Sequence, residues 1–260
     1  MKTNRLWMLL MLLVSFSWNV EGQEAEDSTK IWTRTGSLGM NFSNVGLENW
    51  TGGGVSSVSL GFVSQYKAVR ETEKSVWDNQ IDFAYGLVKQ KGNETFRKTD
   101  DQLILNSQYG YKLNEKWLLS ANMNFRTQIA PAYTYSTDAN GNELRSSRLS
   151  NLMAPGYLNT NIGFTYKHNK LFTATISPLA NKTTFVLDAA INETAFGLDE
   201  GDKVRAEIGW AFTGNFKKKV MDNVNFSTSV ALFANYEEPT TIDVNWETLL
   251  AMKVNKYITA

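Results

Sequence analysis

Apolar and polar side chains alternate with a period of two along most of this chain. The clearest run spans 102–113, where Tyr109 and Tyr111 alternate with Gln108, and the run 117–129 repeats the scheme. Such alternation is typical of a β-strand with two different faces. Both runs exceed the ~5–6 residues of an average strand and suffice for the ~9–11 residues that a tilted strand needs to cross a bilayer.

The same pattern predicts ten strands and the start of another. We expect them at 32–43, 54–67, 76–89, 102–113, 116–130, 157–167, 171–178, 203–216, 224–236 and 241–254, and from 257 onward. Pro131, Pro155, Pro178 and Pro239 fall outside the expected strand interiors, as a hydrogen-bonded ladder requires. No segment after residue 22 has the ~20 apolar residues of a membrane-spanning helix, so any membrane span is expected to consist of strands.

The lengths of the connections favour a transmembrane barrel, in which one rim has short turns and the other has long loops. The longer connections alternate with short ones along the chain and are expected at 44–53, 90–101, 131–156 and 179–202. A soluble sandwich of two sheets is the structural alternative. The two longest loops either fold inward as a plug, cover the mouth, or bind a surface partner.

The strand count indicates that the chain stops before the barrel closes. Single-chain bacterial barrels generally have an even number of strands, whereas the eleventh strand begins at Tyr257 and the chain stops at Ala260. We therefore predict an all-β, antiparallel transmembrane β-barrel of about twelve strands, with the C-terminal strand or strands missing from this chain.

The N-terminus has the pattern of a secretory signal peptide. Lys2 and Arg5 precede an apolar run from Leu6 to Phe16, and Val20-Glu21-Gly22 offers small residues for cleavage. We expect a signal peptide at 1–22, a linker at 23–30 and the barrel at 31–260.

Composition excludes several classes of function. Lys and Arg number 26, as do Asp and Glu, so the net charge of zero gives no electrostatic basis for nucleic-acid binding. Cysteine is absent, which excludes disulfides and thiolate chemistry. The single histidine, His168, lies in an expected turn without a partner nearby in sequence. We expect no enzymatic activity and no cofactor.

Several short motifs resemble a family of Gram-negative outer-membrane β-proteins known only as a domain of unknown function. The motifs are Trp77-Asp78-Asn79-Gln80 leading into Ala84-Tyr85-Gly86-Leu87, Lys98-Thr99-Asp100-Asp101, Tyr109-Gly110-Tyr111-Lys112, Asp243-Val244-Asn245-Trp246-Glu247, and Met252-Lys253-Val254-Asn255-Lys256-Tyr257. The resemblance spans roughly residues 30 to 260. It implies location in the outer membrane and carries no activity.

In a barrel the polar face lines the lumen and the apolar face meets lipid. The inward-facing charges are balanced, five acidic and five basic: Lys67, Asp78, Asp82, Lys112, Arg126, Arg205, Glu207, Asp243, Glu247 and Lys253. The candidate lumen-lining residues are Asp82, Arg126, Gln128, Arg205, Glu207, Asp243 and Glu247.

Two functional alternatives follow from this lining. In the first, the protein is a narrow, porin-like channel for small polar solutes, with a polar constriction near the long loops. In the second, the charges are ion pairs that brace a closed barrel, and the long loops bind a surface or periplasmic protein. Outer-membrane lipid is an expected partner in both.

Overall fold

The computed structural model describes residues 14–19, 32–48, 52, 54–140, 142–169 and 171–252. About three quarters of them belong to strands, and the one helical element among them is the short 3-10 helix η1. The elements are β1 (Val14–Asn19), β2 (Trp32–Val45), β3 (Ser57–Glu71), β4 (Ser75–Gln90), β5 (Arg97–Lys112), β6 (Trp117–Thr127), β7 (Ala132–Thr137), β8 (Glu143–Ser150), β9 (Gly156–His168), β10 (Phe172–Phe185), η1 (Glu193–Phe196), β11 (Val204–Met221), β12 (Val224–Asn235) and β13 (Ile242–Met252).

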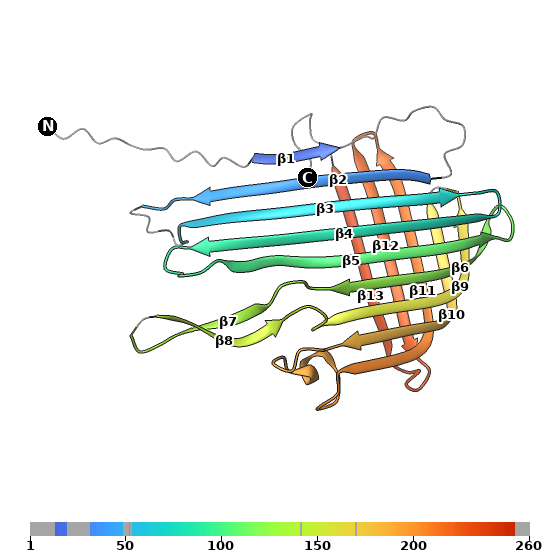
Figure 1. Ribbon diagram of the computed structural model, residues 1–260. Helices are drawn as coiled ribbons and strands as arrows, with labels where there is room; N and C mark the ends of the chain where they lie inside the picture. The colour runs from blue at the N-terminus through green and yellow to red at the C-terminus, as the bar shows by residue number, and fades with distance from the viewer. Residues whose placement is uncertain are drawn as a thin grey trace.

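Eleven strands form one antiparallel sheet in which almost every strand pairs with its neighbours in sequence. Its order is β1-β2-β3-β4-β5-β6-β9-β10-β11-β12-β13, and β7 and β8 form a separate hairpin inserted between β6 and β9. The sheet curves, so that β11, β12 and β13 pass behind β2 to β6 in the view of Figure 1. The predicted all-β antiparallel class is confirmed, and the ten predicted strands correspond to β2 to β6 and β9 to β13, with β1 as an additional edge strand.

The sheet is open in the part of the chain that the structure describes. No pairing joins β13 to β1 or β2, so the sheet does not close into a barrel over these residues. The expected strand from residue 257 lies outside the described residues, as does Lys253. Across the described ranges, no helix is long and apolar enough to span a membrane.

The two faces of the sheet differ in polarity as the alternation predicts. One face, which we call the inner face, carries Asn106, Asn122 and Asn161, whose side chains line a common cavity. The opposite, outer face carries large apolar side chains that remain exposed, such as Ile81 at 44% and Trp117 at 41%. The outer face therefore has no protein layer packed over it among the described residues.

β10 differs from its prediction because it continues beyond Pro178. The register shifts between Ser177 and Ala180, and this bulge takes Pro178 out of the ladder, where its missing N–H has no consequence. Gly163 on β9 makes room for the bulge, because a Cβ there would lie 2.1 Å from the carbonyl oxygen of Ile176. The expectation that Pro178 ends the strand is wrong.

The other differences lie in connections and at the N-terminus. The expected loop 131–156 contains the β7–β8 hairpin, whose strands were not predicted. Within the expected signal peptide, Val14–Asn19 forms β1, which pairs with β2 at the edge of the sheet. Residues 1–13 and 20–31, including the expected cleavage site and linker, lie outside the described residues.

Candidate binding site at the loop-bearing rim

The two longest connections pack against each other at one rim of the sheet. Ala154 lies in the connection between β6 and β9. It forms a small hydrophobic core with Val186, Ile191 and Leu198, which lie in the connection between β10 and β11. Phe196 of η1 packs against this core. The connections therefore form one folded unit rather than two independent loops.

Asp188 ties this unit together through polar contacts. Its carboxylate accepts hydrogen bonds from the backbone N–H of Ala190 (3.0 Å), from Asn151 Nδ2 (2.7 Å) and from Arg148 Nη1 (2.6 Å). These donors lower the pKa of Asp188 from 3.8 to about 2. Asp188 thus joins the segment between β10 and β11 to β8 and to the residues that follow β8.

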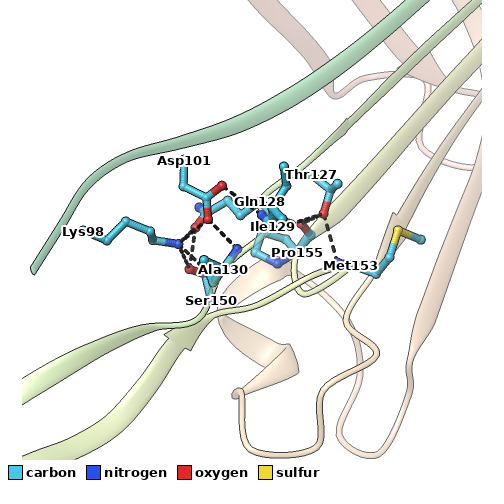
Figure 2. A network of polar contacts seen from close by, with 9 residues as sticks. All are labelled: Lys98, Asp101, Thr127, Gln128, Ile129, Ala130, Ser150, Met153 and Pro155. Carbon is cyan, nitrogen blue, oxygen red and sulfur yellow. Dashed lines mark hydrogen bonds and ion pairs between the residues drawn. The ribbon is translucent and has the colours of Figure 1, made fainter. Parts of the chain in front are cut away.

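A second polar network joins the ends of β5 and β6 to the base of the β7–β8 hairpin (Figure 2). Lys98 Nζ lies 2.7 Å from Asp101 Oδ2 and donates to Gln128 Oε1 (2.8 Å) and to the carbonyl oxygen of Ala130 (2.7 Å). The Asp101 side chain is 1% exposed, and its carboxylate also accepts from the backbone N–H groups of Ile129 and Ala130. This network fixes the chain where it leaves β6.

Ser150 and Thr127 extend the network to the end of the hairpin. Ser150 Oγ contacts Lys98 Nζ and donates to Gln128 Oε1. Thr127 Oγ1 accepts from the backbone N–H of Met153 at 2.9 Å (Figure 2). The base of the hairpin is therefore held from both sides.

A cavity of about 560 Å³, which we call the rim cavity, lies beside this network. Its lining combines polar and apolar side chains: Asp101, Arg126, Thr127, Gln128, Ala132, Leu149, Ser150, Pro155, Tyr157 and Phe196. Arg126 and Tyr157 are register partners on β6 and β9. The guanidinium of Arg126 has no ion-pair or hydrogen-bond partner among the described residues.

A charged cluster lies next to the rim cavity. Lys182 Nζ lies 2.5 Å from Asp243 Oδ2 and 3.9 Å from Glu207 Oε2. Arg205 Nη2 lies 3.0 Å from Glu207 Oε1, and Arg205 Nη1 donates to the carbonyl oxygen of Gly197 just after η1. Tyr157 and Phe196 line both this cluster and the rim cavity, so the two share a wall.

Further along the inner face lies a cavity of about 380 Å³, which we call the amide cavity. Its lining consists mainly of amides and hydroxyls: Lys67, Asp78, Gln80, Asn106, Ser107, Gln108, Asn122, Met123, Asn124, Asn161, Thr173, Thr175, Ser177, Ala211, Thr213 and Asn215. Its two charged residues form an ion pair, with Lys67 Nζ 2.8 Å from Asp78 Oδ2. Cross-strand hydrogen bonds such as Asn122 Nδ2 to Asn161 Oδ1 (2.8 Å) order part of the lining.

The structure brings most of the predicted lining residues together. Arg126 and Gln128 line the rim cavity, and Arg205, Glu207 and Asp243 form the adjacent charged cluster. The remaining two predicted residues lie apart from this group, and the role of all seven in lining a lumen stays a prediction.

Asp82 and Glu247 are the two that lie elsewhere. Asp82 accepts hydrogen bonds from Gln65 Nε2 (2.7 Å) and Gln80 Nε2 (2.8 Å) on the inner face. Glu247 is exposed on β13, and its backbone carbonyl accepts from Thr228 Oγ1.

Sequence reasoning missed Lys98, Lys182, Tyr157 and Phe196. Lys182 and Phe196 fall in a segment predicted to be an irregular loop, so no alternation assigned them a face. Tyr157 stands at the boundary of its predicted strand. The charged ends of the motif Lys98-Thr99-Asp100-Asp101 were a usable signal, because two opposite charges three residues apart next to a strand can pair.

The described residues contain no cluster of potential metal ligands. No three His, Asp or Glu side chains among them gather closely enough to hold a metal ion. His168 Nδ1 lies 3.2 Å from the hydroxyl oxygen of Tyr166, and the rings stack with centroids 6.1 Å apart. These contacts place His168 in an aromatic cluster at the rim with short turns.

Residues 42–133 match the sequence model of the family described as "Protein of unknown function (DUF3078)". The match runs from β2 into β7, so it includes the Lys98–Asp101 ion pair and Arg126. The resemblance to a domain of unknown function is confirmed over this range, and the description states neither a location nor an activity. No curated protein and no solved structure gives a significant match to the chain.

Proposed function

We propose that this protein is an outer-membrane β-barrel that acts as a narrow channel for small polar solutes. The proposal is based mainly on the amide cavity of the inner face. Its lining offers hydrogen bonds to solutes, and its charged pair, Lys67 and Asp78, is mutually neutralised. A neutral, hydrogen-bonding wall suits the passage of small polar molecules without a strong preference for ion sign.

The outer face supports placement in a bilayer. Exposed apolar side chains run across the sheet, from Met40 on β2 (53% exposed) through Ile162 on β9 (52%) to Trp246 on β13 (72%). A soluble protein rarely leaves so extended an apolar surface uncovered, whereas lipid acyl chains would cover it without desolvation cost. Outer-membrane lipid is therefore the proposed partner of this face.

Aromatic side chains at the rim with short turns fit a membrane interface. Trp32 and Trp77 lie with ring centroids 5.6 Å apart, and Trp117 and Tyr166 lie 5.0 Å apart. Rings of Trp and Tyr concentrate at both interfaces of transmembrane barrels. With the short turns at the periplasmic interface, the rim cavity and the charged cluster would face the cell exterior.

Closure of the barrel is part of the proposal. β1 occupies one edge of β2 and coincides with the expected signal peptide. Cleavage of that peptide would free the edge of β2, and pairing of this edge with a later strand would remove both open edges of the sheet. A membrane-spanning sheet needs such closure, because unpaired backbone groups in lipid cost several kcal/mol each.

Planar-bilayer recording of the full chain tests the channel. A shift in gel mobility on heating would first establish that the protein is folded in detergent. We expect steady unitary conductance with weak ion selectivity, and Thr213→Asp should shift the reversal potential toward cations by adding a carboxylate to the amide cavity. Thr213→Asn is the neutral control. A folded protein without conductance would contradict the proposal.

One observation favours a second candidate, a closed barrel that binds a protein partner. The β7–β8 hairpin carries Tyr133 with the guanidinium of Arg145 5.0 Å from its ring centroid, and Tyr135 with that of Arg97 at 4.4 Å. Tyr and Arg are enriched in protein interfaces, and the hairpin projects from the sheet in Figure 1. An electrically silent, folded protein would favour this candidate.

A further inference from the structure

The polar side chains of the rim cavity that have no partner among the described residues can each donate a hydrogen bond to a ligand. The carboxylate of Asp101 is already neutralised by Lys98 and accepts from Lys98 Nζ and from two backbone N–H groups. The hydroxyls of Thr127 and Ser150 are occupied by the network of Figure 2. What remains is the guanidinium of Arg126, the amide N–H groups of Gln128 and the hydroxyl of Tyr157.

The orientation of the Gln128 amide follows from its neighbours. An ammonium group can only donate, so the atom that Lys98 Nζ contacts at 2.8 Å must be the amide oxygen. Ser150 Oγ donates to the same oxygen. The two N–H groups of Gln128 Nε2 are left without a partner among the described residues.

Arg126 differs from the other cations of the Lys98 network and of the charged cluster. Lys98 pairs with Asp101, Lys182 with Asp243 and Glu207, and Arg205 with Glu207. Arg126 faces the rim cavity without a carboxylate partner within the described part of the chain. A guanidinium presents a planar pair of N–H groups that matches the two oxygens of a carboxylate.

The rest of the lining suits the carbon body of such a ligand. Phe196, Leu149, Pro155 and Ala132 supply apolar surface, and Tyr157 presents a ring beside Arg126. A volume of about 560 Å³ falls within the ~300–1,000 Å³ of typical small-molecule sites.

We propose that the rim cavity binds a small organic carboxylate that has a ring or a short apolar body. Arg126 holds the carboxylate, the N–H groups of Gln128 add hydrogen bonds, and Phe196 and Tyr157 contact the body. The inference rests on the proposed function, because it makes this cavity the entrance site of the channel and names the class of solute.

Calorimetric titration of the folded full chain in detergent tests this inference with benzoate as the probe. We expect saturable binding of benzoate and none of benzyl alcohol, which has the same ring without the charge. Arg126→Gln should weaken benzoate binding roughly ten- to hundredfold, the range for hydrogen bonds to a charged group. Arg145→Gln, at an exposed arginine of the hairpin, is the matched control and should bind as the native protein does.

Gln128→Glu provides a variant that should remain folded. Its carboxylate keeps an oxygen for Lys98 and Ser150 but replaces the free N–H groups with a second oxygen, so benzoate binding should fall at least tenfold. Equal affinity for benzoate in the native protein and in both variants, or no binding at millimolar benzoate, would overturn the inference.

The test of benzoate binding and the test of conductance can fail independently of each other. Conductance without benzoate binding would remove only the carboxylate site. Benzoate binding by a protein without conductance would keep the site and contradict the channel.

Discussion

Lys98 and Asp101 form the least exposed ion pair among the described residues, with side chains 10% and 1% exposed. Replacing Lys98 with Met leaves the Asp101 carboxylate without a counter-charge in a buried position. Removing one partner of a buried pair typically costs about 3–5 kcal/mol. We expect the free energy of unfolding, measured by denaturant titration in lipid vesicles, to fall by roughly that amount.

Lys219 supplies the matched control for this substitution. It pairs with Asp222 at 2.9 Å, but both side chains are largely exposed. Exposed ion pairs contribute ~0–1 kcal/mol, so Lys219→Met should change stability little. Equal effects of the two substitutions would show that the Lys98 network does not hold the rim.

Because of Asp188, we expect the folded unit of the two long connections to lose stability in acid. Because the pKa of Asp188 falls from 3.8 to about 2 on folding, its charge stabilises the fold fully above pH ~4. This contribution disappears as the pH falls through about 2. We expect the β7–β8 hairpin to resist pepsin at pH 4 and to become susceptible near pH 2.

Asp188→Asn isolates this effect. The amide keeps the shape but loses the charge that Arg148 contacts at 2.6 Å, so pepsin should cleave the hairpin of this variant faster than that of the native protein at pH 4. Near pH 2 the two proteins should be cleaved at similar rates. Identical cleavage rates at pH 4 would show that Asp188 does not anchor the hairpin.

The bulge in β10 depends on a glycine of the neighbouring strand, β9. A Cβ at position 163 would lie 2.5 Å from Ser177 Cα as well as 2.1 Å from the Ile176 carbonyl oxygen. Since backbone atoms cannot move aside cheaply, Gly163→Val should destabilise the protein by about 1–3 kcal/mol, as overpacking typically does. The midpoint of denaturant unfolding measures the loss.

Gly214→Ala is the control for this element. An added Cβ there would meet only side-chain atoms of Phe212, at 3.4 and 3.5 Å. We expect the unfolding midpoint to stay close to that of the native protein. An unchanged unfolding midpoint for Gly163→Val would contradict the close approach of β9 to the bulge.

Strands were predictable where apolar and polar residues alternate strongly. They were shortened or missed where a proline suggested a strand end or where alternation is weak. The run 102–113 identified β5, although the strand begins earlier, at Arg97. Pro178 suggested an end to β10, because sequence does not reveal a bulge that removes the need for an N–H. The β7–β8 hairpin was missed because its register is irregular and leaves little alternation to read.

Across the whole molecule, the sequence predicted which charged residues lie on the polar face but not which residues they contact. Arg126, Arg205 and Glu207 were predicted to lie on the same polar face of the sheet. Residues from distant segments complete the rim: Lys182 of β10 contacts Glu207 and Asp243, and Phe196 of η1 lines both the rim cavity and the charged cluster. Such contacts depend on the curvature of the sheet and on the packing of the two long connections, which local patterns do not encode.

In the proposed barrel, the outer face of the sheet meets lipid and the inner face meets water. Ile81 and Gln80 are consecutive residues of β4 that point to opposite faces, and Ile81 is 44% exposed. A lysine on the lipid face of a barrel costs about 2–4 kcal/mol at the bilayer midplane, whereas a lysine in the lumen is tolerated. The two positions therefore form a matched pair.

The most direct test measures folding of Ile81→Lys and Gln80→Lys into lipid vesicles, followed by the shift in gel mobility on heating. We expect the folded fraction or the stability to fall strongly for Ile81→Lys and to stay near that of the native protein for Gln80→Lys. Equal insertion of the two variants, or a loss confined to Gln80→Lys, would contradict a lipid-facing outer surface and favour a soluble sandwich of two sheets.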